Sequence, residues 1–173
     1  PIHVVYMGST FNVVHNRVCA EFVISKIAPE VERIKPHTYI FHILGGKLPE
    51  ALKTKCVGPI QYEGYVNNLD NFLAGMDIAL APSLFGAGMQ QKIFEPIVRG
   101  LPTITSRRGL AEYNLSEKHV MLAESIDEYI DALLTLSDAQ TRMRMSNEAH
   151  QYASQTFTEF ALDNIVSRQL EKL

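Results

Sequence analysis

Four residues in the short stretch 86–95 could together bind a phosphorylated ligand: Gly86, Gly88, Lys92 and Glu95. Glycines let a ligand approach the backbone closely, and the unpaired N–H groups that open a helix attract phosphate. A lysine in the first turn of such a helix is unfavourable unless an anion lies nearby. A carboxylate one turn further on can accept hydrogen bonds from the hydroxyl pair of a ribose. The stretch therefore predicts a nucleotide site, in which Lys92 meets phosphate and Glu95 meets ribose.

These residues need a strand, a loop and a helix in succession to position them. The apolar run 78–81 predicts a buried strand, a glycine loop follows it, and an amphipathic helix opens near Met89. Gly100 ends that helix, Pro102 blocks its continuation, and the next strand covers 102–105. This is one βαβ unit. The alternative is a plain crossover helix whose charged side chains face solvent, because a glycine loop before a helix is common in α/β proteins.

Three other predicted strands also run into glycines. They cover 1–8, 38–44 and 60–66, and their glycines are Gly8, Gly45 and Gly64. Parallel sheets bind ligands at the carboxyl ends of their strands. We therefore expect these glycines to line one cleft together with the loop that contains Gly86 and Gly88.

Helical patterns separate these strands and fill the end of the chain. Helices are expected over 12–34, 49–55, 68–74, 126–134, 138–155 and from about 158, and a last short strand over 119–123. Pro29 should kink or split the first of these helices. Alternating strands and helices predict a Rossmann-like, three-layer α/β/α domain with a mostly parallel sheet and a helical C-terminal third. A single domain is expected over 1–173.

The stretch 86–102 resembles the donor-binding signature of GT-B fold retaining glycosyltransferases of family 4, in the glycosyltransferase group 1 proteins. The branch it resembles has Gly-x-Gly-hydrophobic-Gln-x-Lys-hydrophobic-x-Glu, then a helix of small residues, Gly, x and Pro. The matching positions are Gly86, Gly88, Met89, Gln90, Lys92, Glu95, Gly100 and Pro102. The family's usual signature has two glutamates separated by seven residues. The second matches Glu95, whereas the first falls on Ala87.

The resemblance implies transfer of a hexose from a nucleoside diphosphate sugar to a sugar or glycan acceptor, with retention of configuration, in glycan or polysaccharide biosynthesis. Lys92 and Glu95 would be the catalytic residues, and both would also bind the donor. Backbone N–H groups near Gly88, Met89 and Gln90 would hold the diphosphate.

The resemblance also assigns residues at the other strand ends. Gly8 and Ser9 match the family's first loop, near the diphosphate, although a capping or surface role also suits Ser9. Gly64, Tyr65 and Val66 match a turn whose backbone contacts the nucleobase; an ordinary βα turn is the alternative. No metal and no cofactor besides the donor are expected, because the sequence has no Asp-x-Asp motif of the kind that holds a diphosphate through a cation.

Composition argues against several other classes of protein. A net charge of −3 gives no electrostatic case for nucleic acid or an anionic membrane as partner. Two cysteines are too few for a disulfide scaffold, which favours a reduced, cytoplasmic protein. No apolar run approaches the roughly 20 residues of a membrane span.

The abrupt start, without an initiator Met, suggests the C-terminal half of a longer two-domain protein. The missing N-terminal domain would supply the acceptor site, and peripheral membrane attachment could come through it. This chain alone should then bind UDP, GDP or ADP without turnover. A sugar-nucleotide epimerase of similar fold and a non-catalytic α/β interaction module are the alternatives.

Overall fold

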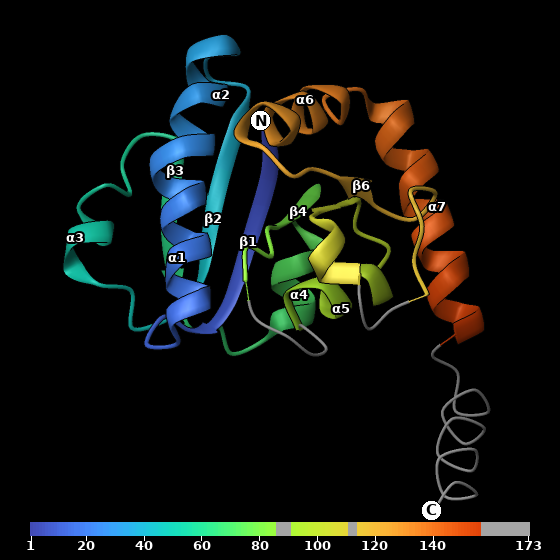
Figure 1. Cartoon of the computed structure of the whole chain (residues 1–173), viewed down its shortest axis with the longest axis horizontal. Helices are drawn as coiled ribbons and strands as arrows, with labels where there is room; N and C mark the ends of the chain where they lie inside the picture. The colour runs from blue at the N-terminus through green and yellow to red at the C-terminus, as the bar shows by residue number, and fades with distance from the viewer. Residues whose placement is uncertain (86–90, 111–113, 157–173) are drawn as a thin grey trace, which may run out of the picture.

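A central strand, β1 (Ile2–Thr10), organises the sheet. The computed structural model describes residues 1–85, 91–110 and 114–156 (Figure 1). Within these residues six parallel strands lie in the order β3-β2-β1-β4-β5-β6. The other strands are β2 (Tyr39–Gly46), β3 (Ile60–Gly64), β4 (Ile78–Ala81), β5 (Thr103–Thr105) and β6 (Met121–Leu122). The strand order reverses between β1 and β4, and ligands of such sheets bind at the carboxyl side of this point.

The first helical segment is continuous but irregular. It comprises α1 (Val14–Phe22), a π-helical turn η1 (Val23–Ile27) and α2 (Ala28–Ile34). The N–H of Ala28 donates to the carbonyl of Val23, an i to i+5 bond, directly before Pro29. Proline cannot donate to the helical ladder, so the disturbance expected at Pro29 takes the form of a wide turn just ahead of it. The helix is neither split nor ended there.

The remaining helices follow the predicted pattern within one or two residues in most cases. They are α3 (Glu50–Lys53), α4 (Leu69–Ala74), α5 (Gln91–Val98), a 3-10 turn η2 (Arg107–Leu110), α6 (Ile126–Thr135) and α7 (Ala139–Thr156). Side-chain caps explain where α4 and α6 begin. Asn68 accepts from the N–H of Asn71 at 2.9 Å, and Ser125 accepts from the N–H of Glu128 at 3.2 Å. The helix expected from about 158 lies outside the described residues, as does the predicted start of α5 near Met89.

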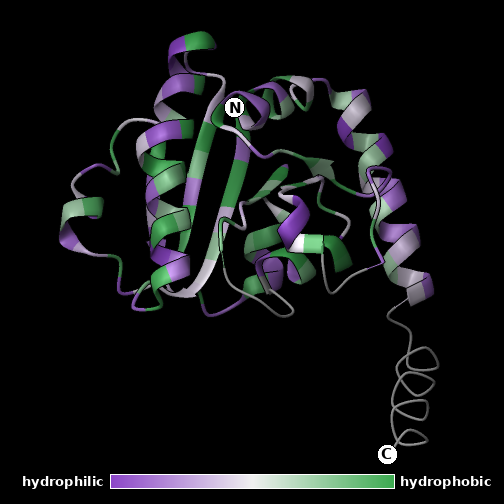
Figure 2. Cartoon of the chain, viewed as in Figure 1, coloured by the Kyte–Doolittle hydropathy of each residue, from purple (hydrophilic) through white to green (hydrophobic). Residues whose placement is uncertain are grey.

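Apolar side chains cover both faces of the sheet. Tyr6 and Phe41 of the sheet pack with the first helical segment and with α6, whereas Val5 and Leu44 pack with Leu73 of α4. Figure 2 shows this as largely hydrophobic strands between helices of mixed character. A smaller cluster joins α5 to α7. The predicted Rossmann-like α/β/α fold with a helical C-terminal region is therefore confirmed, and the parallel strands direct all their carboxyl ends to one edge.

Candidate functional site

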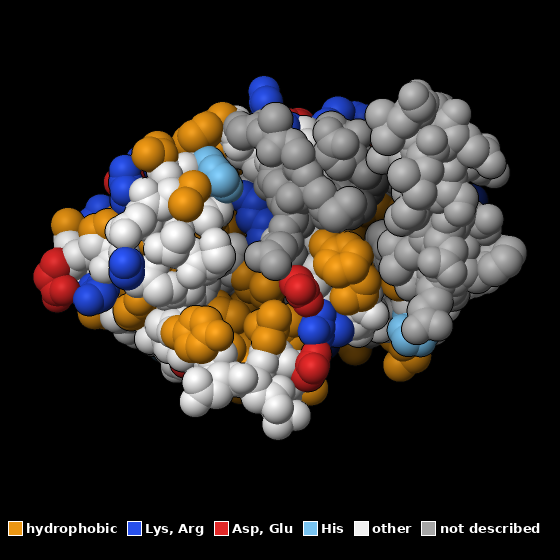
Figure 3. Space-filling model, turned by 90° about the horizontal axis from the view of Figure 1, so that it is seen from below, with side chains coloured by type: hydrophobic (Ala, Val, Ile, Leu, Met, Phe, Trp, Pro, Cys, Tyr) orange, Lys and Arg blue, Asp and Glu red, His pale blue; other side chains and the backbone are white. Residues whose placement is uncertain are grey.

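A pocket of about 330 Å³ opens at the carboxyl ends of β1, β2 and β3, beside α5. Seven predicted site residues line it: Gly8, Ser9, Gly64, Tyr65, Val66, Lys92 and Glu95. The four other predicted residues, Gly86, Gly88, Met89 and Gln90, lie outside the described residues. Figure 3 views the molecule from this edge, where acidic and basic side chains lie among hydrophobic ones. Segments far apart in the sequence thus meet in one cavity next to the point where the strand order reverses.

Glycine is required at two strand ends that form this pocket. Gly45 has φ +146°, and a Cβ atom on it would lie 1.9 Å from the carbonyl oxygen of Gly8. The ends of β1 and β2 can approach so closely only because Gly45 has no side chain. Gly64 has φ +66°, a left-handed conformation that turns the chain away from β3.

Lys92 is the buried cation of the pocket. Its residue is 6% exposed, its Nζ donates to the Sγ of Cys19 over 3.7 Å, and it lies 5.9 Å from the centre of the Tyr6 ring. Burial lowers the pKa of the Lys92 ammonium, and Cys19 offsets part of that effect. A thiol and an aromatic ring compensate a buried charge only weakly. An anion in the pocket would therefore be strongly attracted to this ammonium.

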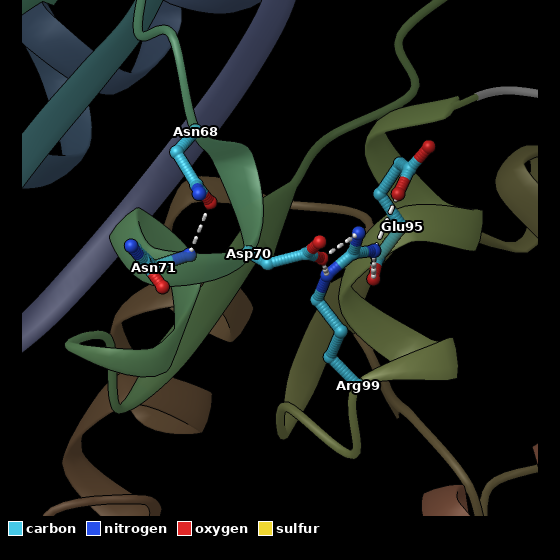
Figure 4. A network of polar contacts seen from close by, with 5 residues as sticks. All are labelled: Asn68, Asp70, Asn71, Glu95 and Arg99. Carbon is cyan, nitrogen blue, oxygen red and sulfur yellow. Dashed lines mark hydrogen bonds and ion pairs between the residues drawn. The ribbon is translucent and has the colours of Figure 1, made fainter.

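Glu95 is the acidic group of the pocket and belongs to a charged network (Figure 4). Its carboxylate pairs with the guanidinium of Arg99, which also donates to Asp70 Oδ1 through Nε at 2.8 Å and Nη2 at 2.5 Å. Partial burial lowers the pKa of Arg99, but the bonds to Asp70 and Glu95 outweigh it, so this pKa is raised overall. Glu95 is therefore held at the pocket wall by a permanently charged partner.

Several residues of the site were missed in the sequence. The wall includes the apolar Met7, Leu44 and Leu69. Met7 and Leu44 lie near the ends of β1 and β2, and Leu69 opens α4, but apolar residues at such positions carry no signal of ligand contact. His15 on α1 does not line the pocket, but partial burial and the charge of Lys92 lower its pKa.

Two arginines, Arg17 and Arg107, are not part of this pocket. Arg17 donates through Nη1 to the carbonyl of Phe11 at 3.3 Å, and Arg107 pairs with Glu117 at 3.6 Å. Neither lines the cavity. Arg17 thus stabilises the turn between β1 and α1, and Arg107 forms an exposed surface pair.

A second pocket, of about 420 Å³, lies on the other side of Arg99, between α4, the turn after α5, and α7. Asp70, Asp77 and Arg142 contribute charged groups to it, and none of the predicted site residues lines it. Among the described residues, no cluster of His, Cys, Asp and Glu could hold a metal ion. No helix in the same part of the chain has the length and apolar character needed to cross a bilayer.

Comparison with known families decides which group this fold and pocket belong to. The family described as "Glycosyl transferases group 1" matches residues 1–139. The chain belongs to the group 1 glycosyltransferases. No curated protein matches the sequence of this glycosyltransferase chain.

Solved structures place this glycosyltransferase chain among GT-B domains. A TarM variant from S. aureus, in complex with UDP, Fondaparinux and alpha-GlcNAc-glycerol, aligns with a TM-score of 0.74 and 14% identity over 98% of this chain and 34% of TarM. HepE from Anabaena, in complex with UDP, aligns with a TM-score of 0.75 and 14% identity over 99% of this chain and 49% of HepE. The C-terminal domain of LpcC from Francisella tularensis aligns with a TM-score of 0.68 and 15% identity, over 91% of this chain and 87% of that domain. The chain thus spans about a third of TarM and about half of HepE.

Proposed function

We propose that this chain is the donor-binding half of a retaining, family 4 glycosyltransferase, which transfers a hexose from a nucleoside diphosphate sugar to a sugar or glycan acceptor. The observation that carries the proposal is one pocket lined by both a buried lysine and a carboxylate from the same helix, Lys92 and Glu95. Three strand ends complete its wall. A basic group for phosphate and an acidic group for ribose then lie in one cavity.

Lys92 would act on the diphosphate. As the glycosidic bond of the donor breaks, negative charge develops on the leaving phosphate, and a fixed ammonium in a desolvated site stabilises that charge. The weak compensation of Lys92 by Cys19 and Tyr6 supports this role, because neither of these described neighbours is a strong acceptor for the ammonium. The neighbouring residues Gly88, Met89 and Gln90 would add backbone N–H groups, as the resemblance to the family implies. The reaction would then need no metal ion.

Glu95 and the turn at 64–66 would hold the nucleoside. The Glu95 carboxylate would accept hydrogen bonds from the ribose hydroxyls, while the backbone of Gly64, Tyr65 and Val66 would meet the base. Gly8 and Ser9 would border the diphosphate. UDP is the first nucleotide to test, because the HepE and TarM structures contain it.

The acceptor would bind to a second, N-terminal domain, so we propose that this chain alone binds nucleotide but does not turn over. The partial coverage of TarM and HepE, and the match to a C-terminal domain of LpcC, support this division. Glycan or polysaccharide biosynthesis in the cytoplasm is the setting that we propose for the complete enzyme, with membrane attachment, if any, through the other domain.

Calorimetric titration of the chain with UDP, GDP and ADP tests the proposal. We expect saturable binding of one nucleotide, and a loss of at least tenfold in affinity for Lys92→Ala and for Glu95→Ala, on the order of 1.4 kcal/mol each. The exposed residues Lys26 and Glu21 on the first helical segment offer matched controls, and their alanine variants should bind as the wild type does. A folded chain that binds none of the three nucleotides would contradict the proposal and favour a non-catalytic interaction module.

A further inference from the structure

Arg99 joins two carboxylates that come from different helices. It follows α5 directly, and its guanidinium pairs with Glu95, one turn earlier, and with Asp70 in the first turn of α4 (Figure 4). The side chains of Arg99 and Glu95 are 27% and 22% exposed, whereas Asp70 is 79% exposed. The inner part of the network is thus partly shielded from water, which strengthens charged hydrogen bonds relative to those of a surface pair.

The backbone at the end of α5 fixes where this guanidinium lies. The N–H of Arg99 donates to the carbonyl of Pro96 at 3.1 Å, in place of the usual α-helical bond to the carbonyl of Glu95. That carbonyl instead accepts from Nη1 of Arg99 at 2.9 Å. Helix ends leave such carbonyls without partners, and a cation is favoured there. The same Nη1 also pairs with Oε2 of Glu95. Backbone and side chain of Glu95 are therefore held by one group.

Asp70 extends this network toward the turn at 64–66. Asn68 caps α4 immediately after that turn, and Leu69, the neighbour of Asp70, lines the pocket. Arg99 consequently ties the pocket carboxylate to the helix that follows the turn. A displacement of α4 would therefore change the position of Arg99 and, through Arg99, that of the Glu95 carboxylate.

We propose that Arg99 is a positioning residue that sets recognition of the ribose by holding Glu95 in one orientation. The inference rests on the proposed function, because it takes Glu95 as the ribose-binding group. Arg99 donates to Oε2, so Oε1 is the oxygen that would accept from a hydroxyl of the ligand. A carboxylate that is fixed before the ligand arrives loses little side-chain entropy on binding. The fixed carboxylate also lowers the affinity for a ligand that lacks the hydroxyl, because the carboxylate oxygen is then desolvated without a hydrogen-bond partner.

Loss of Arg99 has two separable effects. Removal of a positive charge near the nucleotide pocket weakens the binding of every nucleoside diphosphate alike. Release of Glu95 lets its carboxylate rotate toward solvent, which lowers the preference for a ribose over a deoxyribose. The ratio of affinities for the two sugars therefore reports positioning, whereas the absolute affinity reports charge and stability as well.

The experiment is a calorimetric titration with the tightest-binding nucleoside diphosphate of the UDP, GDP and ADP set and with its 2′-deoxy form. The variants are Arg99→Met, Arg99→Lys and Asp70→Asn. We expect Arg99→Met to reduce the ribose preference by about tenfold, Asp70→Asn to reduce it less, and Arg99→Lys to restore part of it, since lysine keeps the charge but not the planar fork. Arg33→Met is the matched control: it removes another Arg–Glu pair, with Glu30 on α2, and should leave the ratio unchanged.

The outcomes separate the two claims. An unchanged ratio in a folded Arg99→Met variant, with both affinities reduced equally, overturns the positioning role and leaves the proposed function standing. A wild-type chain that binds no nucleotide overturns the proposed function and this inference with it. Thermal unfolding followed by circular dichroism shows which variants are folded. In the background of Glu95→Ala, Arg99→Met should change the ratio no further.

Discussion

The Nζ atom of Lys92 lies 3.7 Å from the Sγ atom of Cys19, and these two buried side chains join α5 to α1. A thiol is a weak acceptor, so the partner that this buried ammonium has among the described residues compensates its charge only weakly. A site that destabilises the free protein in this way is suited to an anionic ligand. Loss of the Lys92 charge should therefore raise the stability of the unliganded protein and lower its affinity for a nucleotide.

Replacing the buried charge should make the unliganded protein more stable. We expect Lys92→Met to raise the free energy of unfolding by on the order of 1 kcal/mol, because apolar replacements of poorly compensated buried charges are often stabilising. The same variant should lose nucleotide binding. Urea unfolding monitored by circular dichroism measures the first effect, and Lys26→Met is the exposed control. A clear loss of stability in Lys92→Met would show instead that the ammonium is well compensated by its neighbours.

The stability gap between Lys92→Met and the wild type should depend on pH. The pKa of Lys92 is lowered in the folded state by burial, relative to about 10.4 in the unfolded chain. Between these two values the unfolded wild type binds more protons, so its stability rises with pH. The gap should therefore be largest at neutral pH and close as the pH rises toward about 10.4. Urea titrations of both proteins across this alkaline range measure it, and a constant gap would contradict the burial effect.

Two glycines of the pocket should respond very differently to alanine. Gly45→Ala places a Cβ against the backbone oxygen of Gly8, so the ends of β1 and β2 must separate, at a cost of about 3 kcal/mol. Gly64→Ala meets no atom closer than 4.0 Å, so only its left-handed backbone is strained, by about 1–2 kcal/mol. Thermal unfolding of both variants gives the comparison. Equal losses would mean that the close approach at Gly45 can relax.

Tyr65 offers an exposed ring at the edge of the pocket. Its residue is 82% exposed, although aromatic side chains normally bury much of their surface. We expect a bound base to stack on it, so that Tyr65→Ala weakens nucleotide affinity by about tenfold, while Tyr65→Phe retains it. Calorimetric titration of both variants measures this. Unchanged affinity in Tyr65→Ala would mean that only the backbone of this turn meets the base.

The fold could be predicted because its signals are local. The apolar run at 78–81 and the glycines near the ends of β1, β2 and β3 mark buried strands and their ends without reference to the rest of the chain. Alternation of strands and helices then determines the parallel sheet. The π-helical turn before Pro29 is a detail that proline chemistry allows but does not specify, since a kink or a break would also have satisfied it.

The candidate site could be predicted only in part, for a related reason. Its glycines, Lys92 and Glu95 have a recognisable spacing, and their convergence follows from a parallel sheet. Arg99 pairs with Glu95 from one helical turn away, but the other contacts of these charged groups have no such spacing. Cys19 is 73 residues from Lys92 and Asp70 is 29 residues from Arg99, and no periodicity in the sequence links them. These contacts depend on how the helices pack, which is the step that local patterns leave undetermined.

The most direct test of the central claim is to locate the bound nucleotide on the chain. Amide chemical shifts of the isotopically labelled protein can be followed by NMR during titration with UDP, or with GDP or ADP if these bind more tightly. We expect the largest changes at the strand ends and at α5, on Gly8, Gly45, Gly64, Tyr65 and Glu95. Changes centred instead on the pocket between α4 and α7, at Asp77, Arg142 and Met143, would contradict it.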